Sequence, residues 1–277
     1  MIELAPHHKT GLPVANPLLL AGGIIGYGEA KHPSLATERL GGVVVGPILW
    51  YSRGGASGLR LAQLNGGFVL ETGLQNRGLN TVLRQFAGLW PRLGTPVIAQ
   101  LADDQPAMLG RVAARLAAVP GLSGLELLPP PAVAPELLRS LVQAATRASD
   151  LPVWVKLPLA NATQLAPVAV DAGAVGLVIG QPSLGSARRG SIVLTGSLFG
   201  PLTFAATLTV LVAVAGLGLE CALLACGGIY TASHLFQALE AGASAVQIDA
   251  AVWAEPALPG WLLAHWQAAQ RQKASVG

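Results

Sequence analysis

The stretch ACGGIYTASHLFQALEAGASAVQIDA, residues 225–250, decides the fold. Its pattern predicts a strand, a Gly-Gly turn, an amphipathic helix, a short turn and a second strand, which make a βαβ unit. Such a unit is typical of the end of a (β/α)8 barrel, where phosphate groups commonly bind the loops after strands seven and eight. Gly227 and Gly228 would let backbone N–H groups approach an anion closely. Asp249 ends the second strand, and its carboxylate would repel that anion.

Short apolar runs alternate with helical stretches along the rest of the chain, which predicts a parallel sheet. The expected strands span residues 17–21, 42–49, 96–101, 124–128, 152–157, 175–179, 222–225 and 245–248. The expected helices span residues 33–40, 81–89, 105–118, 135–148, 163–172, 203–214, 231–240 and 256–270. Since no linker or low-complexity segment divides the chain, we expect one α/β domain over residues 1–277, a (β/α)8 TIM barrel.

Two insertions interrupt the regular alternation of strands and helices. Residues 50–77 follow the second expected strand and are rich in glycine, and residues 181–200 follow the sixth and contain many Ser and Gly. Both are too long for plain connections, and long segments at the C-terminal mouth of a barrel usually cover an active site. We therefore expect two long loops over the mouth.

The composition limits the classes of partner. Only 11% of the residues are charged, and the net charge of +3 is spread along the chain, so nucleic-acid binding is not expected. Residues 201–219 approach membrane-spanning length, but Pro201 and two glycines interrupt them, which favours a buried helix and strand over a span. The first residues resemble no signal peptide, which predicts a cytoplasmic protein. The low charge favours a homo-oligomer or a partner subunit.

Two charged residues stand inside otherwise apolar strands. Lys156, in PVWVKLPL, is expected either at the barrel mouth or extended to the rim with its ammonium in water. At the mouth it could neutralise a reduced flavin ring, form a Schiff base with a carbonyl substrate, or bind an acidic substrate. Glu126, in GLELLPPP, has either a raised pKa or an ion-pair partner, for which Lys156 on the next strand is the candidate.

Other polar residues carry weaker signals. Glu71, Asn76 and Arg77 lie in the first insertion, where they could bind a substrate or simply be solvated. The five histidines are scattered without metal-ligand spacing, so no metal site is expected.

Five ordered motifs resemble the dihydroorotate dehydrogenase family of FMN-dependent barrels over most of the chain. They are NPLLLAGGIIGYGE (residues 16–29), GFVLETGLQNRGLN (67–80), PVWVKLP (152–158), GSLFGPL (196–202) and ACGGIYTASHLFQALEAGASAVQI (225–248). The resemblance implies a flavin oxidoreductase of a pyrimidine-biosynthesis family, acting on a small-molecule substrate. It implies FMN contacts at Gly22, Gly23, Lys156, Gly200, Gly227, Gly228, Asp249 and Ala250. It implies substrate contacts at Asn76 and Ser183.

The chain departs from the family pattern at its chemical positions. The loop that carries the family's Cys or Ser base reads LPPPAV (residues 128–133) here, and its side chains cannot transfer a proton. A substrate asparagine of the family corresponds to Leu70, and the Asn-Thr/Ser pair falls near residues 181–183. The second-strand lysine corresponds to Gly46, and the final Gly-Thr pair corresponds to Asp249 and Ala250.

Two functions therefore remain open. One is an FMN-dependent oxidoreductase that does not use the usual dihydroorotate mechanism and acts on a less polar substrate. The other is a catalytically inactive barrel that has lost the cofactor and serves as a subunit or scaffold. A Schiff-base enzyme that uses Lys156 is a third possibility, although no neighbouring acid–base set supports it.

Overall fold

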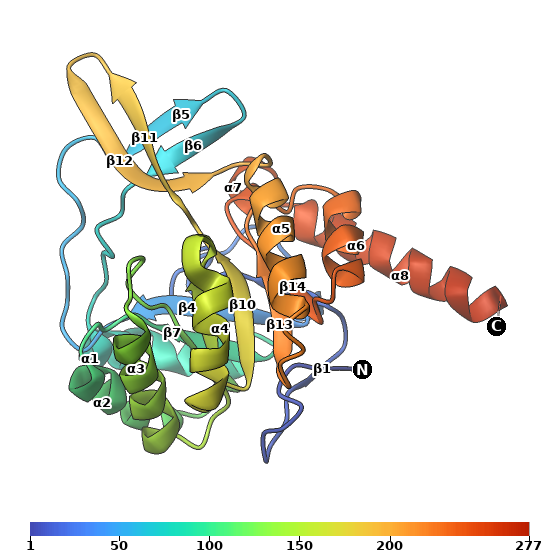
Figure 1. Ribbon diagram of the computed structural model, residues 1–277, viewed down its shortest axis with the longest axis horizontal. Coiled ribbons are helices and arrows are strands. Elements are labelled where there is room, and N and C mark those ends of the chain that lie inside the picture. The colour runs from blue at the N-terminus through green and yellow to red at the C-terminus, as the bar shows by residue number, and fades with distance from the viewer. Residues whose placement is uncertain (277) are drawn as a thin grey trace.

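A closed barrel of eight parallel strands forms the body of the molecule (Figure 1). The computed structural model describes residues 1–276. The barrel strands, in chain order, are β3 (Leu18–Leu20), β4 (Gly42–Ile48), β7 (Val97–Leu101), β8 (Gly124–Leu127), β9 (Val153–Pro158), β10 (Gly176–Gln181), β13 (Ala222–Cys226) and β14 (Ala245–Ile248). Each strand pairs with its neighbour in parallel, and β14 closes the barrel on β3, where Gln247 lies opposite Leu19. The predicted (β/α)8 TIM barrel is confirmed.

Helices connect the barrel strands and cover their outer face (Figure 1). They are α1 (Leu79–Phe86), α2 (Pro106–Ala117), α3 (Pro135–Ala148), α4 (Ala162–Asp171), α5 (Thr203–Ala215), α6 (Ala232–Glu240), the short α7 (Ala251–Ala254) and α8 (Leu258–Val276). Pro106 and Pro135 start α2 and α3, a position where the missing N–H costs nothing. The Thr231 hydroxyl caps α6 by accepting the His234 N–H. Among residues 1–276, no helix combines the length and apolar character that a membrane crossing requires.

The helix predicted over residues 33–40 is wrong. This segment contains only the 3-10 turn η1 (Thr37–Arg39), and none of the three residues is buried. A helix in a protein is stabilised mainly by burying an apolar face, and this segment offers too little apolar surface to pack. Two further 3-10 segments, η2 (Ala87–Arg92) and η3 (Leu159–Asn161), follow α1 and β9.

An N-terminal hairpin closes the lower end of the barrel, which is the end where the barrel strands begin. Strands β1 (Ile2–Glu3) and β2 (Pro13–Val14) pair antiparallel, and the segment between them packs beneath the barrel interior. The Trp154 indole N–H donates to the Leu4 carbonyl over 2.9 Å. Gly124 and Gly176 face the same indole, and a Cβ at either glycine would collide with the ring. The lower barrel is therefore a packed apolar core, which leaves the opposite end for a site.

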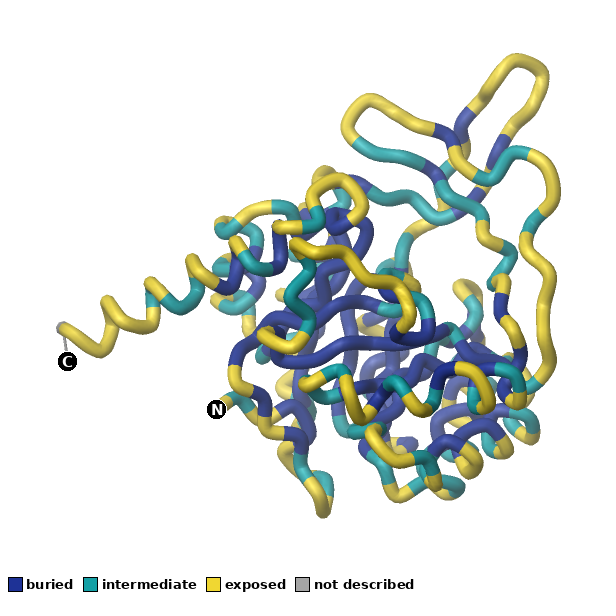
Figure 2. The backbone as a smooth tube through the Cα atoms, turned by 180° about the vertical axis from the view of Figure 1, so that it is seen from behind, coloured by how far each residue is buried: buried dark blue, intermediate teal, exposed yellow. Residues whose placement is uncertain are grey.

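The two long insertions form a sheet, which corrects the expectation of long loops. Strands β5 (Leu61–Leu64), β6 (Gly67–Leu70), β11 (Leu184–Arg189) and β12 (Ile192–Phe199) pair antiparallel in the order β11-β12-β6-β5. The sheet stands away from the barrel (Figure 1), and its tips are exposed (Figure 2). Its own small core contains Ala62, Val69, Ala187 and Leu194. A two-stranded hairpin is only marginally stable by itself, so each insertion depends on pairing with the other.

Candidate functional site at the barrel mouth

A buried carboxylate organises the interior of the upper barrel. Glu126 on β8 is fully buried, and its Oε1 lies 3.4 Å from the Lys156 Nζ on β9. Gln100 on β7 donates its side-chain N–H to the same oxygen over 2.7 Å, and Gln247 on β14 donates to the other oxygen. The ion pair anticipated between Glu126 and Lys156 is confirmed. Every partner of Glu126 is a donor, so this network satisfies an ionised carboxylate.

The same network fixes the charge of Lys156. Burial opposes the ammonium, but Cys226, Glu126 and Asp249 outweigh burial and raise the pKa of Lys156 above its usual range. Burial raises the pKa of the Cys226 thiol to about 12, so the thiol carries no charge at neutral pH. Lys156 therefore stays protonated. A protonated amine is not a nucleophile, which argues against the Schiff-base alternative.

The Gly-Gly turn after β13 has a structural explanation. Gly227 and Gly228 have φ values of +100° and +75°, which favour glycine. A Cβ at Gly228 would collide with the Phe204 N–H group at the start of α5. A Cβ at Gly227 would lie 3.2 Å from the Thr207 hydroxyl. These glycines are thus required for packing against α5, whether or not an anion binds.

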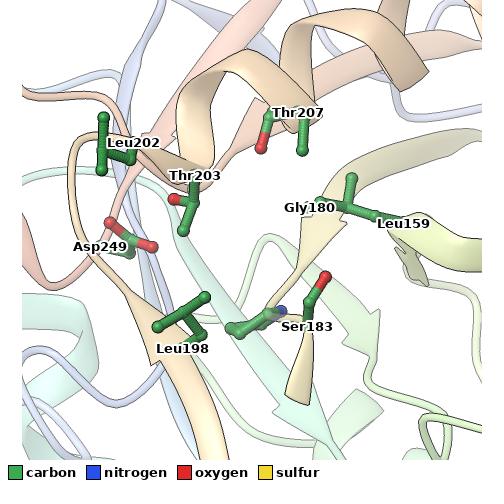
Figure 3. A pocket seen from close by; sticks show the side chains of 11 residues that line it. Leu159, Gly180, Ser183, Leu198, Leu202, Thr203, Thr207 and Asp249 are labelled. Atoms are coloured by element: carbon green, nitrogen blue, oxygen red, sulfur yellow. The ribbon is translucent and has the colours of Figure 1, made fainter. Parts of the chain in front are cut away.

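A cavity of about 220 Å³ opens beside this turn, and Asp249 lines it (Figure 3). The carboxylate comes from the end of β14 and is 7% exposed. Burial raises the pKa of Asp249 to about 6, although Lys156 and nearby backbone N–H groups act in the opposite direction. The other lining residues are Leu159, Gly180, Pro182, Ser183, Leu198, Leu202, Thr203, Ala206, Thr207 and Gly227. Asp249 is thus the ionisable group of a mainly apolar cavity.

The structure brings together only some of the predicted site residues. Ser183, Gly227 and Asp249 share the cavity, and Ala250 follows Asp249 as a buried residue. Gly22 lies against the buried network, because a Cβ there would meet the Gln100 amide at 2.7–2.8 Å.

Three residues with predicted contacts, Asn76, Gly200 and Gly23, do not line this cavity. Asn76 is buried but folds its own loop, since its side chain donates to the Leu74 carbonyl and accepts the Gly78 N–H. Gly200 does not line the cavity, and its Cα packs against the β5–β6 turn. A Cβ on Gly23 would meet no atom within 4 Å, so this glycine is not held by packing.

Several residues of the mouth were missed by sequence reasoning. Gln100 and Gln247 interrupt the apolar strands VIAQL and AVQI, a signal of the same kind that identified Lys156. Thr203 and Thr207 read as ordinary helix residues, and only the packing of α5 against β10 and β13 places them in the cavity wall.

Two of the expected departures from the family pattern coincide with features of the backbone. Gly46 has φ +120°, and a Cβ there would lie 2.9 Å from the Gln100 carbonyl oxygen, so a lysine at this position would require β4 to move. In the loop after β8, the Pro129 carbonyl accepts the side-chain N–H of Gln181 over 3.0 Å. Gln181 is thereby turned toward the protein.

Comparison with known proteins gives the ancestry of this barrel. The family model of dihydroorotate dehydrogenase matches residues 7–260. The chain belongs to the dihydroorotate dehydrogenase family. Similar curated members of the family include the catalytic subunit of dihydroorotate dehydrogenase B (NAD(+)) from Desulforudis audaxviator, which is 30% identical over 272 residues, covering 89% of this chain and 86% of that protein. The corresponding subunit from Bacillus mycoides is 29% identical over 264 residues, covering 89% and 85%.

A solved dihydroorotate dehydrogenase from Eimeria tenella, in complex with ferulenol, has the same fold. The TM-score is 0.81 over 99% of this chain and 85% of that protein, at 18% sequence identity. This likeness shows that the architecture of the family is retained although the sequence has diverged.

The dihydroorotate dehydrogenase family generally uses FMN, and the residues of this chain do not fit the flavin phosphate. Of the described residues that line the cavity beside the Gly-Gly turn, none is basic, and one is the Asp249 carboxylate. Like charges about 4 Å apart repel by about 1 kcal/mol in bulk water and by about 4 kcal/mol near a protein surface. The positive charge of Lys156 is already matched by Glu126. A phosphate dianion would therefore meet net repulsion here.

Proposed function

We propose that this chain is a barrel subunit of the dihydroorotate dehydrogenase family that does not carry out the family's flavin chemistry. The observation that carries the proposal is the position of Asp249, a buried carboxylate beside Gly227 in the loops where barrel enzymes hold phosphate. The absence of a proton-transferring side chain in residues 128–133 supports it independently. Cofactor site and catalytic base are thus both altered, which disfavours dihydroorotate oxidation.

A role as a subunit is supported by the sheet that stands away from the barrel. Leu61, Leu184, Ile192 and Val193 are all more than half exposed on this sheet. Exposed apolar side chains on a projecting element are typical of a surface that another protein covers. The similar relatives are named catalytic subunits. We infer that this chain also assembles, with a partner protein or with a second copy of itself.

Absorbance and titration test the proposal directly. The purified protein should show no flavin band between 300 and 550 nm, and titration with FMN should give no saturable binding. Dihydroorotate with common electron acceptors should give no orotate. A matched variant, Asp249→Asn, removes the carboxylate charge but keeps its shape. If the carboxylate is the obstacle, this variant should bind FMN more tightly than the wild type does, whereas Asp171→Asn, on the far end of α4, should not.

The protonated state of Lys156 favours one alternative, an FMN-dependent oxidoreductase with another substrate. A permanent cation near the C-terminal end of β9 could stabilise an anionic reduced ring, and the apolar cavity wall suits a substrate less polar than dihydroorotate. A flavin band near 450 nm in the wild-type protein would favour this alternative and contradict the loss of the cofactor. Lys156→Ala should then weaken the flavin complex.

A further inference from the structure

Two of the three side-chain hydroxyls in the cavity wall, on Thr203 and Thr207, already donate their protons within the protein, and the third is on Ser183. The Thr203 hydroxyl donates its proton to the Gly200 carbonyl over 2.8 Å, and the Thr207 hydroxyl donates to the Cys226 carbonyl over 3.3 Å. A hydroxyl has one proton and two lone pairs, so each threonine has only acceptor capacity left for the cavity. Figure 3 shows these two oxygens and those of Asp249 around one space. The cavity therefore lacks side-chain donors at these three positions.

Neighbouring segments also contain buried acceptors without a partner. Among the described residues, the buried side-chain N and O atoms without a hydrogen-bond partner are all oxygens, on Asn161, Gln181 and Gln247. Gln181 stands between two cavity-lining residues, and Asn161 ends the 3-10 turn that contributes Leu159. Buried acceptors without donors cost free energy until a donor reaches them. None of Asn161, Gln181 and Gln247 lines the cavity itself, so the preference of the site for a hydrogen-bond donor rests on Asp249, Thr203 and Thr207.

The charges point the same way. Lys156 lies 3.4 Å from Glu126, and among the described residues Asp249 has no basic partner within 4.0 Å. When ionised, Lys156, Glu126 and Asp249 together carry one net negative charge in a buried setting. An uncompensated buried charge is strongly unfavourable, and a bound cation would remove the imbalance.

We propose that the cavity between β14, β13 and α5 binds a small primary amine, whose ammonium group lies against the Asp249 carboxylate and donates to the Thr203 and Thr207 hydroxyl oxygens. An ammonium has three donors and no acceptor, which matches these three groups. The apolar part of the ligand would contact Leu159, Leu198 and Leu202. This binding site goes beyond the proposed function and does not depend on whether the barrel has catalytic activity.

The volume limits the size of the ligand. An engineered apolar cavity of about 150 Å³ binds benzene, so a cavity of about 220 Å³ would hold on the order of nine non-hydrogen atoms. Benzylamine is a suitable probe, since it is a cation at neutral pH and falls within this size. Benzyl alcohol has the same number of non-hydrogen atoms but no charge, which makes it a matched control.

The charge state of Asp249 makes the binding dependent on pH. The titratable groups that surround it are Lys156 on β9, Glu126 on β8, Cys226 on β13 and Tyr230 in the turn after β13. Lys156 remains protonated, and burial raises the pKa of Cys226 and of Tyr230 to about 12, so these three do not change charge between pH 5 and pH 7.5. Protonation of Asp249 near pH 6 should weaken amine binding about tenfold from pH 7.5 to pH 5.

Isothermal titration calorimetry of the full chain tests the site. At pH 7.5 we expect benzylamine to bind at least tenfold more tightly than benzyl alcohol. Asp249→Asn should weaken benzylamine binding at least tenfold and abolish its advantage over the alcohol, while Asp171→Asn should change neither affinity. Equal affinities for the two probes, no saturable benzylamine binding up to millimolar concentration, or unchanged benzylamine binding to Asp249→Asn would each overturn the proposal.

The wild-type probe comparison and its pH dependence decide the matter even if Asp249→Asn fails to fold. A parallel FMN titration separates the two proposals. FMN binding without amine binding would contradict both the loss of the cofactor and the amine site. Amine binding in the presence of a bound flavin would contradict only the loss of the cofactor.

Discussion

Glu126 and Lys156, on the neighbouring strands β8 and β9, form a buried ion pair with 3.4 Å between the Glu126 Oε1 and the Lys156 Nζ. Their side chains are 0% and 5% exposed. The two amides of Gln100 and Gln247 complete the hydrogen bonding of the carboxylate. The Lys156 ammonium is thereby held by the protein itself.

Breaking this pair should destabilise the barrel strongly. Glu126→Gln removes the carboxylate that lies within 4.0 Å of the buried Lys156 ammonium, and removing one partner of a buried pair typically costs about 3–5 kcal/mol. Lys156→Met should cost a similar amount, because it leaves the carboxylate alone. The double variant should cost clearly less than the sum of the two single changes. Urea unfolding of all four proteins measures this coupling, and additive effects would show that the pair is not coupled.

Neutralising Asp249 should stabilise the protein at alkaline pH. The folded Asp249 carboxyl has a pKa of about 6, whereas the ordinary pKa of an aspartate is 3.8, so the folded state binds more protons between these two pH values. The stability contribution of this group therefore falls as pH rises from about 4 to 6, by at most about 3 kcal/mol. Asp249→Asn should exceed the wild type in urea midpoint at pH 8, and the gap should shrink toward pH 4.5. A constant gap at both pH values would contradict the raised pKa.

The barrel itself could be predicted from the sequence because its signal is local and repeated. Apolar runs such as VIAQL and ALLAC are bounded by turns and followed by helical patterns, and each unit reports its own structure. The additional antiparallel sheet could not be predicted in the same way. Its pairs, such as Leu198 with Val69, join segments more than a hundred residues apart, and neither segment has a strong pattern of its own.

Site residues could be predicted from the sequence only where a charged residue interrupts or directly follows an apolar strand. Lys156, Glu126 and Asp249 stand out as charges beside apolar strands, and the structure places all three in the upper barrel. Thr203 and Thr207 do not stand out, since threonine is ordinary in a helix. The direction of their hydroxyl protons follows from the Gly200 and Cys226 carbonyls, which only the folded chain brings near.

Adding a methyl group beside the Trp154 indole should show how tightly the lower barrel is packed. Gly176→Ala adds a methyl group that collides with the indole ring, and overpacking a core typically costs about 1–3 kcal/mol. The control Gly88→Ala adds a methyl group where no atom lies within 4 Å, so its stability should stay within about 0.5 kcal/mol of the wild type. Thermal unfolding of both variants makes the comparison. Equal stability of the two would mean that the hairpin and the indole can shift aside freely.

Lys156 should not form a Schiff base at neutral pH. Its raised pKa leaves less free amine than on an ordinary lysine, and its burial keeps an aldehyde from reaching the amine. Incubation with a small aldehyde and sodium borohydride, followed by peptide mass spectrometry, should show adducts on the exposed Lys9 and Lys31 and none on Lys156. The variant Glu126→Gln removes one source of the raised pKa and should increase labelling of Lys156 if it folds. Efficient trapping of Lys156 in the wild type would show instead that the amine is free, and it would reopen carbonyl chemistry for this barrel.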